Sequence, residues 1–212
     1  MAAFDYKKAE QQLYLPKEQP VIVDVPQMQF VAVEGEGDPN VEDGAYSAAL
    51  TMLYALSFTI KMSEKNKREI KGYFPYVLPP LEGFWWMANG SPGVDYANKA
   101  GFHWLAVIRL PEFVTPDIFA WAKEEAAKKK KIDMSATTLL TLREGLCVQC
   151  MHTGSYDAEP ATVAKMDRFI AENGYVTDFS PMRRHHEIYL NDPRRTAPEK
   201  LKTVIRHPIR LK

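Results

Sequence analysis

The 212-residue chain carries 27 Lys and Arg residues against 27 Asp and Glu residues, so its formal net charge at pH 7 is zero. A neutral chain lacks the positive field that draws proteins onto nucleic acid or anionic lipid, and neither partner is expected. No stretch approaches the roughly 20 apolar residues of a membrane span, and residues 1–14 lack the apolar core of a signal peptide. We therefore expect a cytoplasmic protein of one large domain, whose oligomeric state the sequence leaves open.

The first half of the chain shows one helix pattern among three strand patterns. Residues 1–24 are polar and interrupted by proline, which indicates an N-terminal extension rather than a domain. A strand pattern covers residues 27–33, and apolar side chains recur at helical spacing over residues 43–62. Two further apolar segments, residues 81–87 and 102–110, are typical of buried strands.

A second helix is predicted to begin at Pro116, because Thr115 is a favourable N-cap and proline fits the first helical position. Four lysines, Lys128 to Lys131, close this helix. Lysines complement the negative end of the helix dipole, so they indicate a solvated helix end rather than a nucleic-acid patch.

The second half repeats the order of the first. A strand pattern in residues 146–153 precedes a helix that ends at Gly174. Strand patterns then follow at residues 185–191 and 201–209. Each half thus reads as a strand, a helix and two more strands.

This repetition predicts an internal duplication, in which residues 27–110 and 146–209 form two related modules. Each module has half a core and must pack against its twin. The predicted fold class is therefore α+β, with a duplicated β-α-β-β module inside a single domain that spans residues 1–212.

The two cysteines, Cys147 and Cys150, form a C-x-x-C sequence inside a strand pattern. Strand residues three apart face opposite sides of a sheet, whereas redox and zinc motifs need both sulfur atoms on one side. We therefore predict two ordinary reduced cysteines.

When the two halves are aligned by their predicted elements, residues 81–85 align with residues 186–190. Glu82 then aligns with Glu187. Phe84 shares the strand face of Glu82, and Tyr189 shares the face of Glu187. A carboxylate flanked by aromatic rings is either a solvent-facing residue or a charge inside an apolar pocket, and its recurrence favours the pocket. If the two faces converge, desolvation and repulsion should raise one pKa and provide an acid and a base.

Neighbouring strand residues point in opposite directions, which divides the roles of two further pairs. Of Trp85 and Trp86, one can enter the core while the other stacks on a ligand, and Trp86 is preferred because it shares the face of Glu82. His185 shares the face of Glu187, whereas His186 points away from it. The two histidines therefore predict no joint metal site.

Several segments together resemble the stand-alone branch of the GyrI-like small-molecule-binding family. No single segment is diagnostic, but their order and the chain length are fairly specific. The segments are residues 4–8, 13–17, 33–40, 79–86 and 186–193. The resemblance implies an antiparallel, barrel-like sheet around a central ligand pocket, as in the effector-binding domains of multidrug-sensing transcription regulators. No helix-turn-helix segment precedes the pocket domain here, so direct transcriptional control is not expected.

The resemblance also implies roles for particular residues. In those regulators a pocket glutamate lies in a Glu-x-Tyr segment that matches residues 187–189. Some stand-alone members are hydrolases of cyclopropane-bearing, DNA-alkylating natural products, in which a carboxylate would activate water and a proton donor would assist the developing phenolate. Glu187 and Glu82 would then share acid and base work. The expected ligand-binding residues are Trp86, Trp85, Phe84, Tyr189, Tyr156 and His185, with no cofactor and no metal.

Two readings of function remain open from the sequence. One is an enzyme that hydrolyses electrophilic aromatic toxins, and the other is a non-catalytic protein that sequesters flat, especially cationic, aromatic compounds. Turnover separates them, because a binder saturates at one ligand per site. The sequence names no natural ligand and does not decide whether the protein contacts gyrase.

Overall fold

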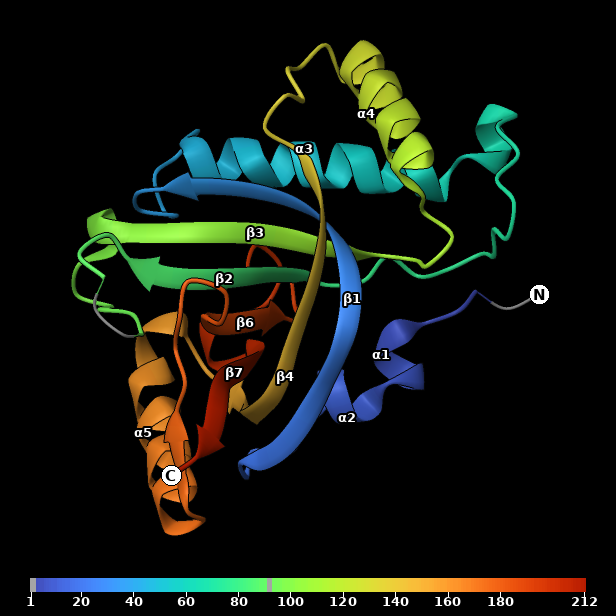
Figure 1. The fold of residues 1–212 in the computed structure, drawn as a ribbon. Coiled ribbons are helices and arrows are strands. Elements are labelled where there is room, and N and C mark those ends of the chain that lie inside the picture. The colour runs from blue at the N-terminus through green and yellow to red at the C-terminus, as the bar shows by residue number, and fades with distance from the viewer. Residues whose placement is uncertain (1–2, 91–92) are drawn as a thin grey trace.

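Six antiparallel strands close into a barrel in the computed structural model, which describes residues 3–90 and 93–212; Met1 and Ala2 of the N-terminal extension lie outside the described residues. The strands lie in the order β4-β1-β3-β2-β6-β7-β5, and β4 also pairs with β7, which completes the ring (Figure 1). The strands are β1 (Val21–Glu36), β2 (Leu81–Met87), β3 (Phe102–Leu110), β4 (Thr138–Thr153), β5 (Tyr175–Thr177), β6 (His185–Tyr189) and β7 (Lys202–Leu211).

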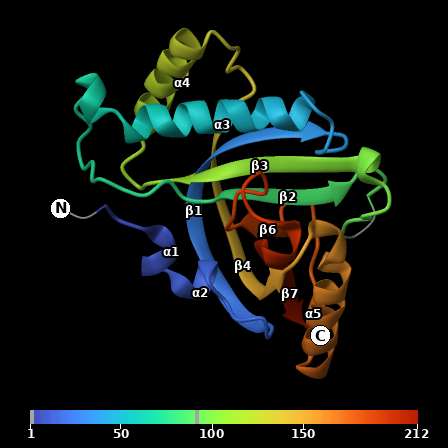
Figure 2. The ribbon, with the colours of Figure 1, turned by 180° about the vertical axis from the view of Figure 1, so that it is seen from behind.

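Helices cover the barrel from three directions. In both views α3 and α4 lie above β3, whereas α5 lies on the side of the barrel away from α1 and α2 (Figures 1 and 2). The α-helices are α1 (Tyr6–Ala9), α2 (Gln11–Tyr14), α3 (Ala45–Lys61), α4 (Pro116–Lys130) and α5 (Glu159–Glu172). The short 3₁₀ helices are η1 (Glu64–Asn66), η2 (Lys99–Gly101), η3 (Tyr156–Ala158) and η4 (Pro198–Lys200). None of the helices in the described residues combines the length and apolar content that crossing a lipid bilayer requires.

The duplicated β-α-β-β module predicted from the sequence is confirmed. The first half runs β1-α3-β2-β3 and the second runs β4-α5-β6-β7, with the three-residue β5 added. In each half the last strand lies between the other two, giving β1-β3-β2 and β4-β7-β6. The halves meet twice, at the pairs β1–β4 and β2–β6, so neither half has a free sheet edge at these junctions.

Two strands are longer than their sequence patterns indicate. β1 begins at Val21 rather than at residue 27, and β4 begins at Thr138 rather than at residue 146. The additional residues of each strand pair mainly with the predicted part of the other strand, with Val21 opposite Gln149 and Thr138 opposite Ala32. The backbone groups of each extension are therefore satisfied by the other strand, which is a long-range effect that a local pattern does not contain.

The start of α4 follows its local sequence signal closely. The Thr115 side chain accepts a hydrogen bond from the backbone N–H of Ile118 at 3.3 Å, and Pro116 opens α4, as predicted. The N-cap of α3 is Gly44.

Cys147 and Cys150 are both free and buried. Cys147 pairs opposite Pro208 and Cys150 opposite Ile205, so the two thiols face opposite sides of β4 as expected.

The core is divided by the barrel wall. One cluster fills the space between α3, α4 and the outer face of β1, β3 and β2. A second lies under α5, on the outer face of β4 and β7. A third fills the barrel interior, and it includes Leu13 and Tyr14 of α2, so the N-terminal extension is part of the core.

Candidate functional site

A cavity of about 1470 Å³ opens on the outer face of β2 and β6, where α3 and α5 leave the sheet uncovered. Pockets for small ligands are usually about 300–1000 Å³, so this one has room for a large ligand. Two buried glutamates, Glu159 and Glu187, lie at one end, which we call the acidic end. Aromatic side chains line it there, namely Tyr46, Trp85, Tyr96, Tyr156 and Tyr189.

Glu187 is held at the acidic end by its neighbours two residues away on β6. His185 Nε2 lies 2.8 Å from Oε1, and the Tyr189 hydroxyl donates to Oε2 at 2.8 Å. The strand period of two aims all three side chains at the cavity side of the sheet. Burial raises the pKa of Glu187, but the hydrogen bonds and charge of His185 and the Tyr189 hydroxyl outweigh it and lower the pKa. Glu187 is therefore a carboxylate.

The partner strand β2 supports this arrangement through a glycine. Gly83 pairs directly opposite Glu187. A Cβ atom at Gly83 would lie 2.6 Å from Trp85 Nε1 and 3.1 Å from the Tyr189 hydroxyl. Its absence lets Trp85 Nε1 donate to the Tyr189 oxygen at 2.9 Å, which leaves the hydroxyl proton of Tyr189 directed at Glu187.

Glu159 opens α5 and completes the acidic end, although no feature of the sequence pointed to it. It is 0% exposed, and the Tyr96 hydroxyl donates to Oε2 at 3.0 Å. Its other oxygen, Oε1, receives no hydrogen bond from a donor among the described residues, and the carboxyl group hydrogen-bonds to Glu187. Burial, followed by the neighbouring charge of Glu187, raises the pKa of Glu159 well above its ordinary value. One carboxyl group thus holds a proton while the other is ionised.

Glu159, His185 and Glu187 also meet a distance requirement for a metal site, because one ligand atom of each lies within 4.8 Å of the others. His185 Nε2 and both oxygens of Glu187 are already engaged in hydrogen bonds with each other and with Tyr189. An ion would have to break those bonds, and we assign none.

A second histidine lies behind the first. His185 Nδ1 lies 2.7 Å from His207 Nε2, and both side chains are buried. Burial and the charge of His185 lower the pKa of His207 well below its ordinary value. Neutral His207 therefore fixes the ring of His185 against Glu187 without adding charge.

The expectation that Glu82 and Glu187 converge on one cavity is wrong. Glu82 pairs opposite Ile188, and Phe84 opposite His186, so both point into the barrel interior. Side chains alternate along a strand, and an alignment of the halves that is out of step by one residue exchanges the two faces. The β2 residue beside Glu187 is Gly83.

Trp86 is also absent from the cavity lining, contrary to its preferred role. It shares the face of Glu82, and its ring lies 4.2 Å from the Arg184 guanidinium and 5.7 Å from the His103 ring. Trp85 lines the cavity in its place. Tyr156 and Tyr189 line it too, edge to face at 5.7 Å.

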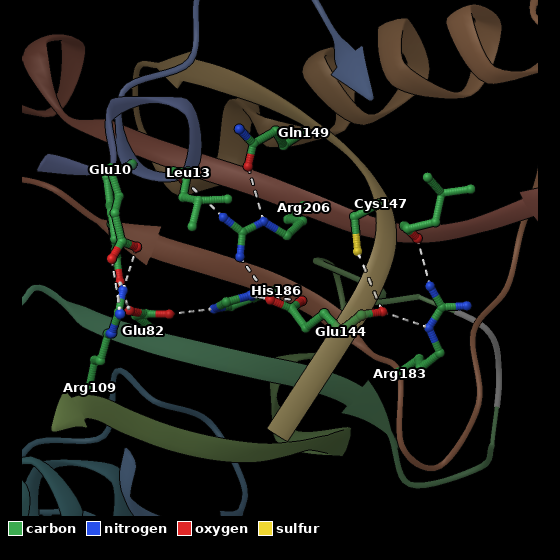
Figure 3. A network of polar contacts seen from close by, with 12 residues as sticks. Glu10, Leu13, Glu82, Arg109, Glu144, Cys147, Gln149, Arg183, His186 and Arg206 are labelled. Carbon is green, nitrogen blue, oxygen red and sulfur yellow. Dashed lines mark hydrogen bonds and ion pairs between the residues drawn. The ribbon is translucent and has the colours of Figure 1, made fainter. Parts of the chain in front are cut away.

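Glu82 belongs instead to a charge network inside the barrel (Figure 3). His186 lies between two carboxylates, with Nε2 3.0 Å from Glu82 and Nδ1 3.0 Å from Glu144. Arg206 donates to Glu144 at 2.7 Å, to Gln149 at 3.0 Å, and to a backbone carbonyl of α2. The void beside Glu82 measures only about 10 Å³, which excludes a ligand.

Comparison with known proteins identifies the family to which this chain belongs. The family model of the GyrI-like small molecule binding domain matches residues 18–210. A hydrolase from Listeria innocua is 42% identical, with 98% of this chain and 100% of that chain covered and a TM-score of 0.88. An uncharacterized conserved protein from Listeria innocua is 43% identical, with the same coverage and a TM-score of 0.91. The C-terminal domain of EcmrR covers 92% of this chain and 98% of its own at 11% identity and a TM-score of 0.53, which shows a shared fold alone.

No curated protein sequence matches the chain. The family model nevertheless spans both modules of the barrel, including every residue of the acidic end. A cavity bounded by aromatic rings and a few directed polar groups is the form that small-molecule sites usually take. The chain belongs to the GyrI-like small-molecule-binding domain family.

Proposed function

We propose that this protein is a hydrolase of electrophilic aromatic compounds that carry a strained cyclopropane ring. The observation that supports this most is a buried, ionised Glu187 at the aromatic-lined end of a large cavity. A carboxylate in this setting can take a proton from water. The 42% identical Listeria innocua protein is described as a hydrolase, which agrees with an enzymatic role.

The proposed reaction uses general base catalysis by Glu187. A water molecule held by Glu187 attacks a ring carbon, and its proton passes to the carboxylate as the new C–O bond forms. The breaking C–C bond sends its electrons into the aromatic system, where a phenolate oxygen develops. The hydroxyl of Tyr156 can donate to that oxygen, because burial, followed by the charge of Glu187, raises the pKa of Tyr156 to about 12 and keeps it protonated.

The aromatic walls orient the flat ligand. The rings of Tyr46 and Trp85 lie 5.4 Å apart at one side of the acidic end. At the other end of the cavity, Tyr54 and Phe58 on α3 are exposed. Residues 46 and 58 are separated by about 18 Å along a helix, so an elongated ligand can contact both ends.

Turnover tests this proposal. Wild-type protein is incubated with an about fifty-fold molar excess of a cyclopropane-bearing dienone. The ring-opened product is followed by liquid chromatography. Consumption of the excess supports a hydrolase. Saturation at one ligand per chain without product would support the alternative, a sequestering protein, which the large aromatic cavity with one carboxylate also suits.

A further inference from the structure

Glu159 has no part in the reaction proposed above, although it is fully buried at the acidic end. Tyr96 donates to Oε2 of Glu159, so the proton of the carboxyl group belongs on Oε1. No donor among the described residues reaches Oε1, and the carboxyl group hydrogen-bonds to the Glu187 carboxylate instead. The acidic end thus holds one carboxylic acid hydrogen-bonded to one carboxylate, with polar atoms that lie within 4.8 Å of each other.

This pair does not suit acyl hydrolysis. Such reactions use a hydroxyl or thiol nucleophile that contacts a base, and donors directed at an oxyanion. The ring nitrogens of His185 contact Glu187 and His207 instead. Among the described residues, no serine, threonine or cysteine hydrogen-bonds to His185, Glu159 or Glu187. The chemistry available is proton transfer.

The short separation of the pair selects among strained rings. In a cyclopropane fused to a dienone, the oxygen that gains charge lies across the six-membered ring from the attacked carbon. Glu159, with a polar atom within 4.8 Å of Glu187, is too close to the base to reach that oxygen. In an epoxide the leaving oxygen is bonded to the attacked carbon itself, so a base and an acid a few ångströms apart can serve both atoms.

We propose that the same cavity hydrolyses aryl-substituted epoxides to vicinal diols, with Glu187 as the base and Glu159 as the acid. The inference rests on the proposed function for the role of Glu187. Water oxygen bonds to one epoxide carbon, the bond from that carbon to the epoxide oxygen breaks, and this oxygen takes the proton of Glu159. Glu187 takes one proton from the water.

The acid and base are restored without a cofactor. After the reaction Glu187 carries a proton and Glu159 is ionised. Their polar atoms are close enough for the proton to return from Glu187 to Glu159, directly or through one water molecule. The hydrogen bonds from Tyr189 and His185 favour the ionised form of Glu187, so this return is downhill.

The aryl requirement comes from the walls of the acidic end. Trp85 packs against Tyr46 there, and Tyr189 packs against Tyr156. A phenyl group on the epoxide can stack between these rings, and an aryl substituent also stabilises positive charge at the carbon that water attacks.

The test uses styrene oxide and trans-stilbene oxide as substrates, and diol formation above the buffer rate as the readout. Single-turnover reactions with enzyme in excess are run in H₂¹⁸O. We expect ¹⁸O in the diol from the first turnover, because water attacks directly. If the oxygen added in the first turnover is ¹⁶O, it comes from a protein carboxylate rather than from water. That result would overturn the assignment of Glu187 as a base.

Paired variants separate this inference from the proposed function. Glu159→Gln should lose about 100-fold or more on epoxides, within the usual range for one acid or base, and less on the cyclopropane substrate. Tyr156→Phe should show the opposite order. Glu172→Gln, at the exposed end of α5, is the matched control. Circular dichroism confirms that each variant is folded.

The outcomes are distinguishable. Cyclopropane turnover without epoxide turnover overturns the epoxide inference alone. No turnover of either substrate overturns the proposed function as well. Epoxide turnover that Glu159→Gln leaves unchanged overturns the role of Glu159 as the acid.

Discussion

Two histidine–glutamate contacts lie back to back on β6. On the interior face, His186 and Arg206 bring two positive charges to the carboxylates of Glu82 and Glu144. Burial raises the pKa of His186's carboxylate partner Glu144, but the charges of His186 and Arg206 outweigh it and lower that pKa to about 2. The void there is too small for a ligand.

On the outer face, His185 contacts Glu187 beside a second carboxyl group and an open cavity. The charges of this group are not matched in pairs, so one carboxyl group must hold a proton. The comparison shows that residue type does not decide between structure and chemistry. The balance of charges and the access of a ligand decide whether such a contact is structural or catalytic.

The largest expected effect separates Glu187 from Glu82. Glu187→Gln keeps the shape of the side chain and removes the base. We expect a loss of about 10²–10⁴ in the single-turnover rate on a cyclopropane substrate. Glu82→Gln should leave the rate per folded molecule much closer to wild type, because Glu82 lies on the other side of the barrel wall. Equal losses in both variants would contradict the separation of the two faces.

The interior network should show its effect in stability. Arg206→Met removes one of the two positive partners of Glu144 and leaves one buried carboxylate charge uncompensated, which should lower the free energy of unfolding by about 3–5 kcal/mol. Urea denaturation followed by circular dichroism measures the change. Adding Glu144→Gln to Arg206→Met should recover part of the loss. A loss below about 1 kcal/mol would indicate that water reaches Glu144.

Sequence patterns predicted the duplicated fold well. The segments 81–87 and 102–110 match β2 and β3 at both ends, because buried strands are marked by continuous apolar residues. Thr115 and Pro116 marked the start of α4 for a local chemical reason. The extensions of β1 and β4 were not predictable in this way, since each pairs with a segment of the other strand that is far away in the sequence.

The candidate site was predicted only in part. Glu187, Tyr189, Tyr156 and Trp85 do line the cavity, whereas Glu82 does not. The alignment of the two halves paired the correct strands, β2 and β6, but it placed Glu82 on the cavity face of the sheet instead of the interior face. Sequence alone does not fix the register of paired strands. Glu159 was not predicted from the sequence, because a glutamate in the first turn of a helix is ordinarily a surface residue that complements the helix dipole.

The two adjacent tryptophans provide a smaller effect. Trp85→Phe should weaken the binding of a flat cationic aromatic compound by about 0.5–2 kcal/mol, because tryptophan is the best cation–π partner and its N–H orients Tyr189. Trp86→Phe should leave the affinity unchanged. Fluorescence titration measures both, and ligand quenching should disappear in Trp85→Phe. Quenching that depends on Trp86 would place the ligand on the interior face.

The smallest expected effect is a pH dependence of stability. The pKa of Glu159 is higher in the folded chain than its ordinary value of 4.5. Between that value and its folded pKa, the folded chain therefore holds a proton that the unfolded chain has lost. Stability of the wild type should fall across this window as the pH rises, whereas glutamine has no proton to retain.

Glu159→Gln should accordingly melt near the wild-type temperature at pH 4 and above it at pH 8. Each kcal/mol removed corresponds to about 2–4 °C for a chain of this length. The sign is opposite for Glu144, whose lowered pKa contributes stability above its ordinary value that is lost as the pH falls toward about 2. Melting curves at several pH values, with Glu172→Gln as the control, provide the measurement. Parallel wild-type and Glu159→Gln profiles would mean that Glu159 is ionised in both states, and the acidic end would then hold two carboxylates rather than an acid and a base.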